Sequence, residues 1–279
     1  MGKLRQVVVV AADLKDAEDK FTKHLDTFVT FRDPELEYFG MHNALLPVGR
    51  SFLEIVSPLP GQEESSAGGR FLQRRGPGGY MLIVQVSPTT LEHARKRADD
   101  LNLRVVHEGS RTQEMESQSF SLGKGPGFDE DGISGFHLHP KDVGCITEIA
   151  TQRPANKWTW AGNEWLKPES RMQIGMSPTR GFAGATIATP DPQKTAKVWA
   201  DLLQLEPERI ENMPSGTPGE CKLHLDDDSF LHFRQPQNPD ESGVVSIHVV
   251  TETSKHEQPG SFDLAGTDLH FHHPLKSKL

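Results

Sequence analysis

Apolar and polar residues alternate along this chain in a pattern that predicts a repeated unit of one strand, one helix and further strands. An apolar run at 7–12 predicts the first strand, and apolar residues at helical spacing predict a helix over 14–25. Further strands are expected at 27–31, 42–48 and 51–57, the last two joined by a tight turn. The first unit is therefore expected to read β-α-β-β-β.

The same order recurs in two further units and begins a fourth. The second unit is expected to hold a strand at 80–86, a helix at 88–101 and strands at 104–107, 117–122, 135–139 and 145–150. The third is expected to hold a strand at 183–189, a helix that Asp191 caps and that ends near 205, and strands at 221–225 and 229–234. The fourth has strands only, at 244–251 and 268–273, so it is expected to be abbreviated.

The units pair into two halves. Two matches between unit ends give the order A-B-A-B, namely 51–58 with 229–236 and 135–140 with 268–274. We therefore expect a first domain at 1–151, a connector at 152–178 and a second, truncated domain at 179–279.

Two segments between the units have distinctive compositions. The connector carries Trp158, Trp160 and Trp165, which we expect to pack the two halves together, the alternative being that one of them lines a pocket. The stretch 61–79 is rich in glycine, serine and arginine and is interpreted as a linker.

The net charge and the cysteines limit the classes of binding partner and the cellular compartment that suit this protein. The net charge of −9 disfavours a nucleic-acid surface, which needs a basic face, and an anionic membrane surface. Cys145 and Cys221 are predicted to lie in different halves, which fits a reducing compartment. No apolar run reaches the length of a membrane span. We expect a cytoplasmic protein, a monomer or homodimer, whose partner is a small molecule.

Paired β-α-β-β-β units that form a cup resemble the vicinal oxygen chelate superfamily, which includes glyoxalase I, methylmalonyl-CoA epimerase, extradiol dioxygenases and the bleomycin- and fosfomycin-resistance proteins. Residues 40–47 (GMHNALLP) look like glyoxalase-like domain proteins, and 139–149 (HPKDVGCITEI) look like the last hairpin of methylmalonyl-CoA epimerases. The resemblance implies an α+β fold of tandem βαβββ modules in cup-shaped, eight-stranded open sheets, with an active first cup and an abbreviated second pair.

The resemblance also implies a metal site. The family's ligand positions fall on Gln6, Glu54 and Glu148, and the remaining position, where the family has histidine, falls on Met81. The ion implied is zinc, nickel, manganese or iron. A thioether is a poor ligand for a hard divalent ion, so Met81 leaves the expected set incomplete. Taken alone, Gln6 is also compatible with a surface position near the terminus.

The two carboxylates are the candidate catalytic residues. Glu54 shares a strand face with Phe52 and Val56, and Glu148 shares one with Ile146. A carboxylate on an apolar face is costly unless it is paired or coordinated. Burial that raises its pKa also suits a carboxyl group to act as a general base.

The candidate substrate-binding residues are His42, His137, His139 and Gln85. Each histidine taken alone is also compatible with a structural role, in which a backbone group satisfies the ring. Near two carboxylates, the histidines are expected either to complete the metal site or to bind an anionic or enolic substrate.

The second half is expected to lack such a site. Its corresponding positions are predicted to be Gly184, His232 and Val245, without a counterpart of Glu148. The cluster His270, His272 and His273 resembles a metal-affinity patch, but it is expected on a truncated edge. The expected role of this half is scaffolding or an internal pseudo-dimer interface.

These features favour a lyase or isomerase that acts on a small carbonyl compound by metal-assisted proton transfer. The alternative is a metal-free binding or resistance-type protein, which Met81 favours and the retained Gln6, Glu54 and Glu148 oppose. An extradiol-type dioxygenase ranks last, because it needs two histidines and one glutamate on iron.

Overall fold

The computed structural model describes residues 2–112, 132–214, 219–252, 262–264 and 266–272. The strands are β1 (Lys3–Val10), β2 (Met41–Val48), β3 (Ser51–Pro58), β4 (Gly78–Gln85), β5 (Val105–Thr112), β6 (Gly132–Leu138), β7 (Ile146–Arg153), β8 (Thr179–Ala188), β9 (Ile210–Asn212), β10 (Cys221–His224), β11 (Phe230–Arg234), β12 (Gly243–Thr251), β13 (Phe262–Leu264) and β14 (Thr267–His272). The helices are α1 (Leu14–Leu25), α2 (Ala67–Arg75), α3 (Pro88–Asp100), α4 (Pro140–Val143), α5 (Pro168–Met176) and α6 (Pro192–Leu202), with short 3₁₀ turns η1 (Pro34–Phe39), η3 (Thr159–Ala161), η4 (Glu164–Leu166) and η5 (Pro207–Arg209).

The strands form two seven-stranded mixed sheets with the same plan. The order is β2-β3-β1-β4-β7-β6-β5 in the first sheet and β13-β14-β12-β8-β11-β10-β9 in the second. In each sheet the leading strands of two modules pair antiparallel, β1 with β4 and β8 with β12. The prediction of tandem βαβββ modules in an α+β fold is therefore confirmed, with a fourth module that has no helix among its described residues.

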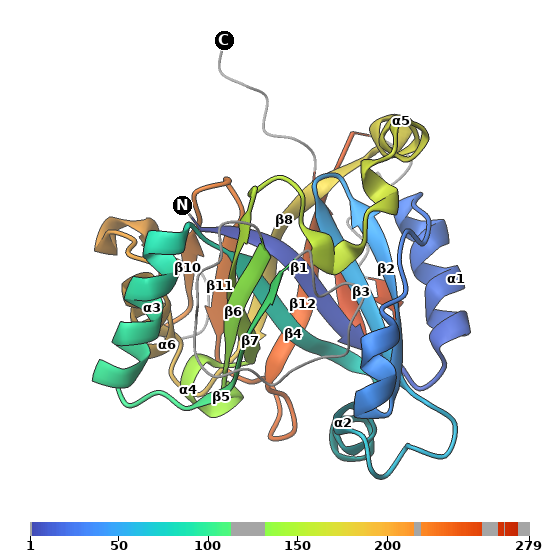
Figure 1. Cartoon of the computed structure of the whole chain (residues 1–279). Helices are drawn as coiled ribbons and strands as arrows, with labels where there is room; N and C mark the ends of the chain where they lie inside the picture. Colours follow the sequence, from blue (N-terminus) through green and yellow to red (C-terminus); the bar gives the residue numbers. More distant parts are fainter. Residues whose placement is uncertain (1, 113–131, 215–218, 253–261, 265, 273–279) are drawn as a thin grey trace.

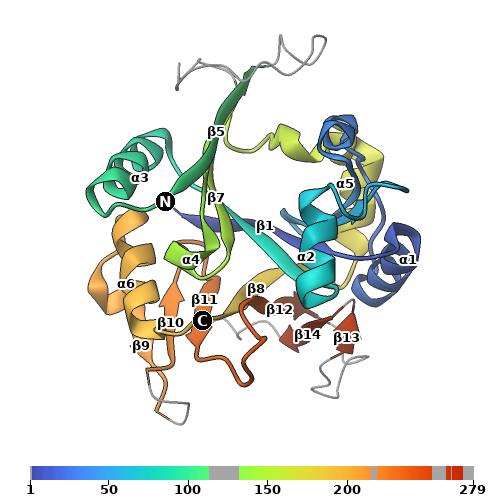
Figure 2. The same ribbon diagram turned by 90° about the horizontal axis from the view of Figure 1, so that it is seen from below.

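The two sheets lie face to face, with α1 on one flank and α3 and α6 on the other (Figures 1 and 2). One apolar cluster runs through both halves, from Val7 and Leu82 to Ile187 and Trp199. The Trp199 indole Nε1 donates to the Val143 carbonyl at 2.9 Å across this contact. The faces turned away from the shared core are the concave faces of the two cups.

Glycine lets the halves approach at backbone distance. A Cβ on Gly79 at the start of β4 would lie 2.3 Å from the Val244 carbonyl oxygen of β12, and one on Gly49 would lie 2.0 Å from the Arg180 carbonyl oxygen. Any larger residue at either position would therefore force the sheets apart.

Sequence and structure differ at three places in the first half. The predicted strand 27–31 makes one isolated bridge, from Phe31 to Leu45, because Asp33 caps the turn that begins at Pro34 and the chain leaves β2 there. The predicted linker 61–79 contains helix α2, capped by Ser66. The predicted strand 117–122 lies outside the described residues. The first sheet accordingly has seven described strands, where eight were expected, and the second, which was expected to be abbreviated, also has seven described strands.

Both cysteines, Cys145 and Cys221, are buried and free. In the part of the chain that the structure describes, every helix is too short or too polar to cross a bilayer.

Candidate active site

The concave face of the first sheet carries the predicted carboxylates. Alternation along β3 and β7 turns Glu54 and Glu148 toward this face, beside the apolar residues Val8, Phe52 and Met81. Both carboxylates are buried. The structure therefore brings Glu54 and Glu148 into one cup.

Two β-bulges, one on each leading strand, shape the cup. Leu4 pairs with Val84 and Gln6 with Ile83, so Arg5 is an extra residue in β1. A bulge turns two consecutive side chains to the same face, which is why Arg5 and Gln6 both contact the cup. A second shift makes Tyr80 the extra residue of β4.

The bulges also fix which residues are equivalent in the two modules. Val8, two residues after Gln6, pairs with Glu54, and Ile83, two residues after Met81, pairs with Glu148. The register therefore equates Gln6 with Met81, and Glu54 with Glu148. This is the assignment expected from the sequence.

Glu54 is held by two side-chain amides. Gln6 Nε2 donates to Glu54 Oε2 at 2.7 Å, and Asn43 Nδ2 donates to Glu54 Oε1 at 2.7 Å. The amide of Asn43 is oriented by the Asp33 backbone N–H, which donates to its Oδ1 at 2.7 Å. The amide of Gln6 is oriented by Trp158, whose Nε1 donates to Gln6 Oε1 at 3.1 Å. Both amides therefore present N–H groups to the carboxylate.

Burial dominates the protonation of Glu54. Loss of solvent raises its pKa from 4.5 to about 7, against the lowering effect of the bonds from Asn43 and Gln6, while the charges of Asp33 and Glu148 add a further increase. Glu54 thus changes its proton near neutral pH, the range in which general acid–base groups work best.

Glu148 has a histidine partner. His137 of the adjacent strand β6 places Nε2 3.4 Å from Glu148 Oε2, and the ring of His107 lies 5.0 Å from that of His137. Gly135 leaves room for the carboxylate, because a Cβ there would lie 2.7 Å from Glu148 Oε1. Burial and the neighbouring His137 lower the pKa of His107.

The connector covers this cup. Trp158 and Trp165 are buried against its concave face, and Trp165 packs edge-on against Phe52 at 5.1 Å. The Arg5 guanidinium lies 5.3 Å from the rings of Phe52 and Trp158 and 5.6 Å from that of Trp165. These two tryptophans therefore pack into the first cup. The expectation that they pack the two halves together is wrong for Trp158 and Trp165.

The Trp158 backbone has φ 45°, a left-handed conformation that is strained for a bulky residue. The surrounding contacts hold the residue there.

Several buried polar atoms under the connector have no hydrogen-bond partner among the described residues. They include Arg5 Nε and Nη2, Gln85 Oε1 and Trp165 Nε1. Gln85 uses its Nε2 to donate to the Ala155 carbonyl of the connector at 2.8 Å. Orphaned buried groups are rare and mark places where a ligand or water is accommodated.

The residues of this cup do not fit a divalent metal ion in the family manner. The one atom of Gln6 that can ligate a metal, Oε1, accepts the Trp158 N–H, and its Nε2 faces Glu54. Each oxygen of Glu54 accepts an amide N–H. Met81 contributes only a thioether.

Two predicted substrate residues lie elsewhere. His42 pairs with Ser57, on the opposite face of the sheet from Glu54, where Arg32 and Asp13 influence it. His139 lies beyond the end of β6 and caps α4, its Nδ1 accepting from Lys141 N at 3.1 Å. His137 and Gln85 do lie on the concave face.

Three site residues were not singled out from the sequence: Arg5, Asn43 and His107. The position of Asn43 could have been predicted from the sequence, because the tight turn at 47–50 fixes the hairpin register and puts Asn43 on the same face as Glu54. Arg5 was not, since nothing in the sequence marks the bulge.

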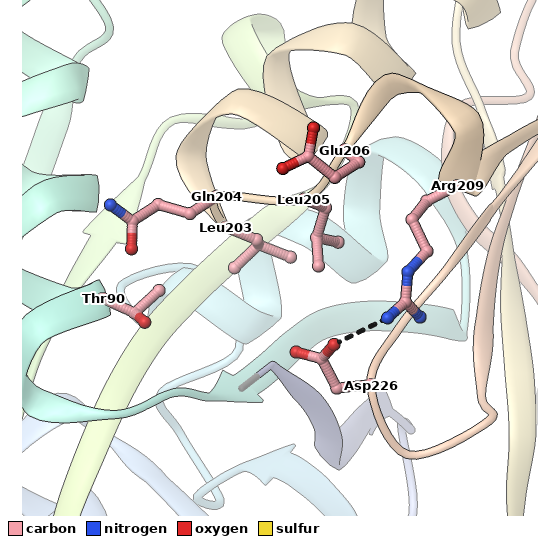
Figure 3. A pocket seen from close by; sticks show the side chains of 7 residues that line it. All are labelled: Thr90, Leu203, Gln204, Leu205, Glu206, Arg209 and Asp226. Carbon is pink, nitrogen blue, oxygen red and sulfur yellow. Dashed lines mark hydrogen bonds and ion pairs between the residues drawn. The ribbon is translucent and has the colours of Figure 1, made fainter.

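The described structure also has a hollow of about 340 Å³ between the halves, lined by Thr90, Leu203, Gln204, Leu205, Glu206, Arg209 and Asp226 (Figure 3). Arg209 Nη2 pairs with Asp226 Oδ1 at 3.1 Å, and Gly2 N donates to Asp226 Oδ2 at 2.6 Å. The charges of Arg209 and Asp226 are thus engaged with each other, within the second half, and with Gly2, which precedes β1, and we place the active site in the cup.

Comparison with known proteins gives three findings. A profile of the glyoxalase-like domain matches residues 7–203. A search of curated proteins found no match. Among solved structures, a hypothetical protein from Staphylococcus aureus is similar over 98% of this chain and 100% of its own, with TM-score 0.63 and 10% identity. Methylmalonyl-CoA epimerase from Mycobacterium tuberculosis is similar over 53% of this chain and 87% of its own, with TM-score 0.39 and 27% identity.

Proposed function

The chain belongs to the glyoxalase-like domain family of the vicinal oxygen chelate superfamily, and from this premise we propose that its first cup catalyses proton transfer on a small carbonyl compound, as a lyase or isomerase. The proposal departs from the sequence expectation in one respect. Because Gln6, Glu54 and Met81 do not fit a metal, the proton transfer is assigned to protein groups alone.

The observation that carries the proposal is Glu54, a buried carboxyl group whose pKa is raised to about 7. At neutral pH, a substantial fraction of such groups is ionised and able to take a proton, and the remainder is able to give one back. The amides of Gln6 and Asn43 hold the carboxylate in a single orientation.

The proposed step uses both modules. Glu54 removes the proton from the carbon next to the substrate carbonyl and becomes the neutral acid, while the substrate becomes an enolate. Glu54 returns the same proton to the adjacent atom, which isomerises the substrate, or a second proton carried by the His137–Glu148 pair is delivered to the other side of the carbon, which inverts it. After inversion Glu54 releases its proton to solvent and the His137–Glu148 pair takes one up from solvent, which restores the starting state.

Arg5 is the proposed partner of the substrate oxygen. Its Nε and Nη2 are buried without a hydrogen-bond acceptor among the described residues, and its charge lies in the same cup as Glu54. A carboxylate or enolate oxygen would accept from these N–H groups. Because Trp158 and Trp165 now cover Arg5, the connector must shift for the substrate to enter.

The test is exchange of the substrate's carbon-bound proton in D₂O, followed by NMR on EDTA-treated protein. The probes are the hemithioacetal of methylglyoxal with glutathione and methylmalonyl-CoA. We expect exchange with at least one probe, and a loss of roughly 10²–10⁴-fold in Glu54→Gln, the range for removal of a general base. His42→Gln is the matched control, because it changes a polar residue on the opposite face of the same hairpin. Exchange that persists in Glu54→Gln, or that requires added metal, would contradict the proposal.

A second candidate is a metal-free binding protein. The orphaned Arg5 donors and Gln85 Oε1 favour it, since a polar ligand would satisfy them without any reaction. Native mass spectrometry of the purified protein separates the two functions. A ligand retained equally by wild type and Glu54→Gln, with no exchange on either probe, supports binding alone.

A further inference from the structure

The concave face of the second cup carries a cluster of histidines. Alternation turns His232 of β11, His248 of β12, and His270 and His272 of β14 toward this face, while Leu231, Ile247 and Leu269 enter the shared core. The ring of His248 lies 4.8 Å from that of His270 and 5.0 Å from that of His272. In the described ranges β13 pairs with β14 only at Thr267–Leu269, so the expected edge position of His270 and His272 stays a prediction; His273 lies outside the described residues.

The sheet register relates this cluster to the first cup. Bulges make Ala183 and Val245 the extra residues, so Gly184 corresponds to Gln6 and Ser246 to Met81. Thr186 pairs with His232 and His248 with His270, which puts His232 in the place of Glu54 and His270 in the place of Glu148. The expectation that Val245 is the third position and that Glu148 has no counterpart is therefore wrong.

A continuous chain of hydrogen bonds crosses the cluster. His232 Nε2 lies 2.7 Å from Glu220 Oε1, and Thr186 Oγ1 lies 3.2 Å from His232 Nδ1. Thr186 Oγ1 also lies 2.8 Å from His248 Nε2, and His248 Nδ1 lies 2.8 Å from His272 Nε2.

An ionised Glu220 sets the direction of every bond in this chain. His232 Nε2–H donates to Glu220, the Thr186 hydroxyl donates to His232 Nδ1, and His248 Nε2–H donates to Thr186. His248 Nδ1 then offers a lone pair, which His272 Nε2–H occupies. The chain thus fixes the tautomer of His248 with Nδ1 as the acceptor.

The rings lie close enough together to face one small ligand. Imidazole nitrogens grouped on one face offer lone pairs to a Lewis acid, and zinc, cobalt and nickel all accept imidazole ligands.

We propose that His248, His270 and His272 form a binding site for one transition-metal ion of the zinc, cobalt or nickel class. Two histidines alternate on one strand and the third faces them from the neighbouring parallel strand. The His248 Nδ1 to His272 Nε2 separation is 2.8 Å, and an opening of about 0.5 Å gives the spacing of two nitrogens that each lie about 2.0–2.1 Å from one tetrahedral ion.

The described arrangement is the closed form of this site. As the rings lie, no three histidine, cysteine, aspartate or glutamate side chains of the described ranges converge on one point. The ion takes the place of the hydrogen between His248 Nδ1 and His272 Nε2. The proton of His272 then moves to Nδ1 of the same ring, an atom that makes no hydrogen bond in the described part of the chain. His270 stacks on His248 and makes no hydrogen bond to another described residue, so its ring is able to turn toward the ion.

The rest of the hydrogen-bond chain supports the ligand. Metal-bound histidines donate their other N–H to a polar group that holds the ring and raises its basicity. His248 has such a partner in Thr186, which is polarised in turn by His232 and Glu220. The first cup has Val8, Ile83 and Ala150 where this cup has Thr186, His248 and His272.

The test is a titration of tag-free, EDTA-treated protein with Co²⁺, read by the visible absorption of the bound ion. We expect one equivalent with a tetrahedral or five-coordinate spectrum, and at least tenfold weaker binding in His270→Gln, with zinc displacing the cobalt. His270→Gln is the informative variant because it breaks no hydrogen bond within the described ranges, and circular dichroism checks that it folds.

Three controls separate this site from others. Glu54→Gln tests the first cup, His24→Gln tests an exposed histidine on α1, and His273→Gln tests the residue that follows β14. Each is expected to bind cobalt as wild type does. The proposal is overturned by absence of cobalt binding, by binding unchanged in His270→Gln, or by binding lost in any control.

Discussion

The two cups share strand order and register but differ in the residues that line them. The first has Glu54 and Glu148 at positions where the second has His232 and His270. The first is filled from above by Trp158 and Trp165, whereas His270 and His272 of the second are only partly buried. One backbone thus supports two chemistries, because a few alternate residues on equivalent strands decide what the concave face can do.

The tryptophans that cover the first cup, Trp158 and Trp165, cause the main electrostatic difference between the two cups. Under the tryptophans, desolvation raises the pKa of Glu54 to about 7, so the first cup holds a proton near neutral pH. In the second cup the group is an imidazole, and burial, together with the nearby His270 and His272, lowers the pKa of His248 to about 2. Desolvation therefore favours the neutral form of the group in each cup, which is the acid of Glu54 and the free base of His248.

The largest effect on stability is expected from removing a tryptophan that covers the first cup. Trp158→Ala deletes a fully buried side chain and the donor to Gln6, so we expect a loss of about 3–5 kcal/mol in the free energy of unfolding by urea. Met172→Ala, an exposed residue of the same connector, is the control and should change stability by less than about 0.5 kcal/mol. A loss below about 1 kcal/mol in Trp158→Ala would show that the connector does not fill the cup.

A smaller effect is expected from breaking the chain in the second cup. Thr186→Val keeps the shape of the side chain but leaves His232 Nδ1 and His248 Nε2 without their partner, which should cost about 1–3 kcal/mol. The ¹⁵N shifts of His248 should also lose their single-tautomer pattern. Ser246→Ala in the same cup is the control. Equal stability of the two variants would show that the hydrogen bonds through Thr186 do not stabilise the second cup.

The smallest effect is expected from the charged contact between the halves. Arg97 Nη2 lies 2.6 Å from Asp201 Oδ2, and both side chains are more than a third exposed. A double-mutant cycle of Arg97→Ala and Asp201→Ala should give a coupling of about 0.2–1 kcal/mol. A coupling above about 2 kcal/mol would mean that this ion pair, rather than the shared apolar core, holds the cups back to back.

Local patterns predicted much of the fold. Helical spacing predicted 14–25, which is the extent of α1, and the side chain of Asp191 caps α6 by accepting from Lys194 N at 3.0 Å. The resemblance to the vicinal oxygen chelate superfamily implied that Glu54 and Glu148 line one cup, and the structure has both on one face of the first sheet. The extent of α1 and the cap of α6 depend on residues close together in the sequence, so local patterns are sufficient to predict them.

The features that were missed depend on distant contacts. A bulge at Arg5 or Val245 changes the register by one residue and leaves no mark in composition. The match of 135–140 with 268–274 made β14 the counterpart of β6, but its parallel pairing with β12 makes it the counterpart of β7. The insertion of Trp158 into the cup is likewise a tertiary event.

The most direct test of the central claim is a pH titration of Glu54 in metal-free protein by NMR of ¹³C-labelled glutamate, assigned by comparison with Glu54→Gln. We predict a midpoint near 7, unchanged by one equivalent of zinc. Because this pKa is raised above 4.5, the folded state holds the extra proton, and the stability that Glu54 contributes is lost as pH rises from 4.5 through 7. A midpoint near 4.5, or a titration abolished by zinc, would contradict a metal-free acid–base site in the first cup.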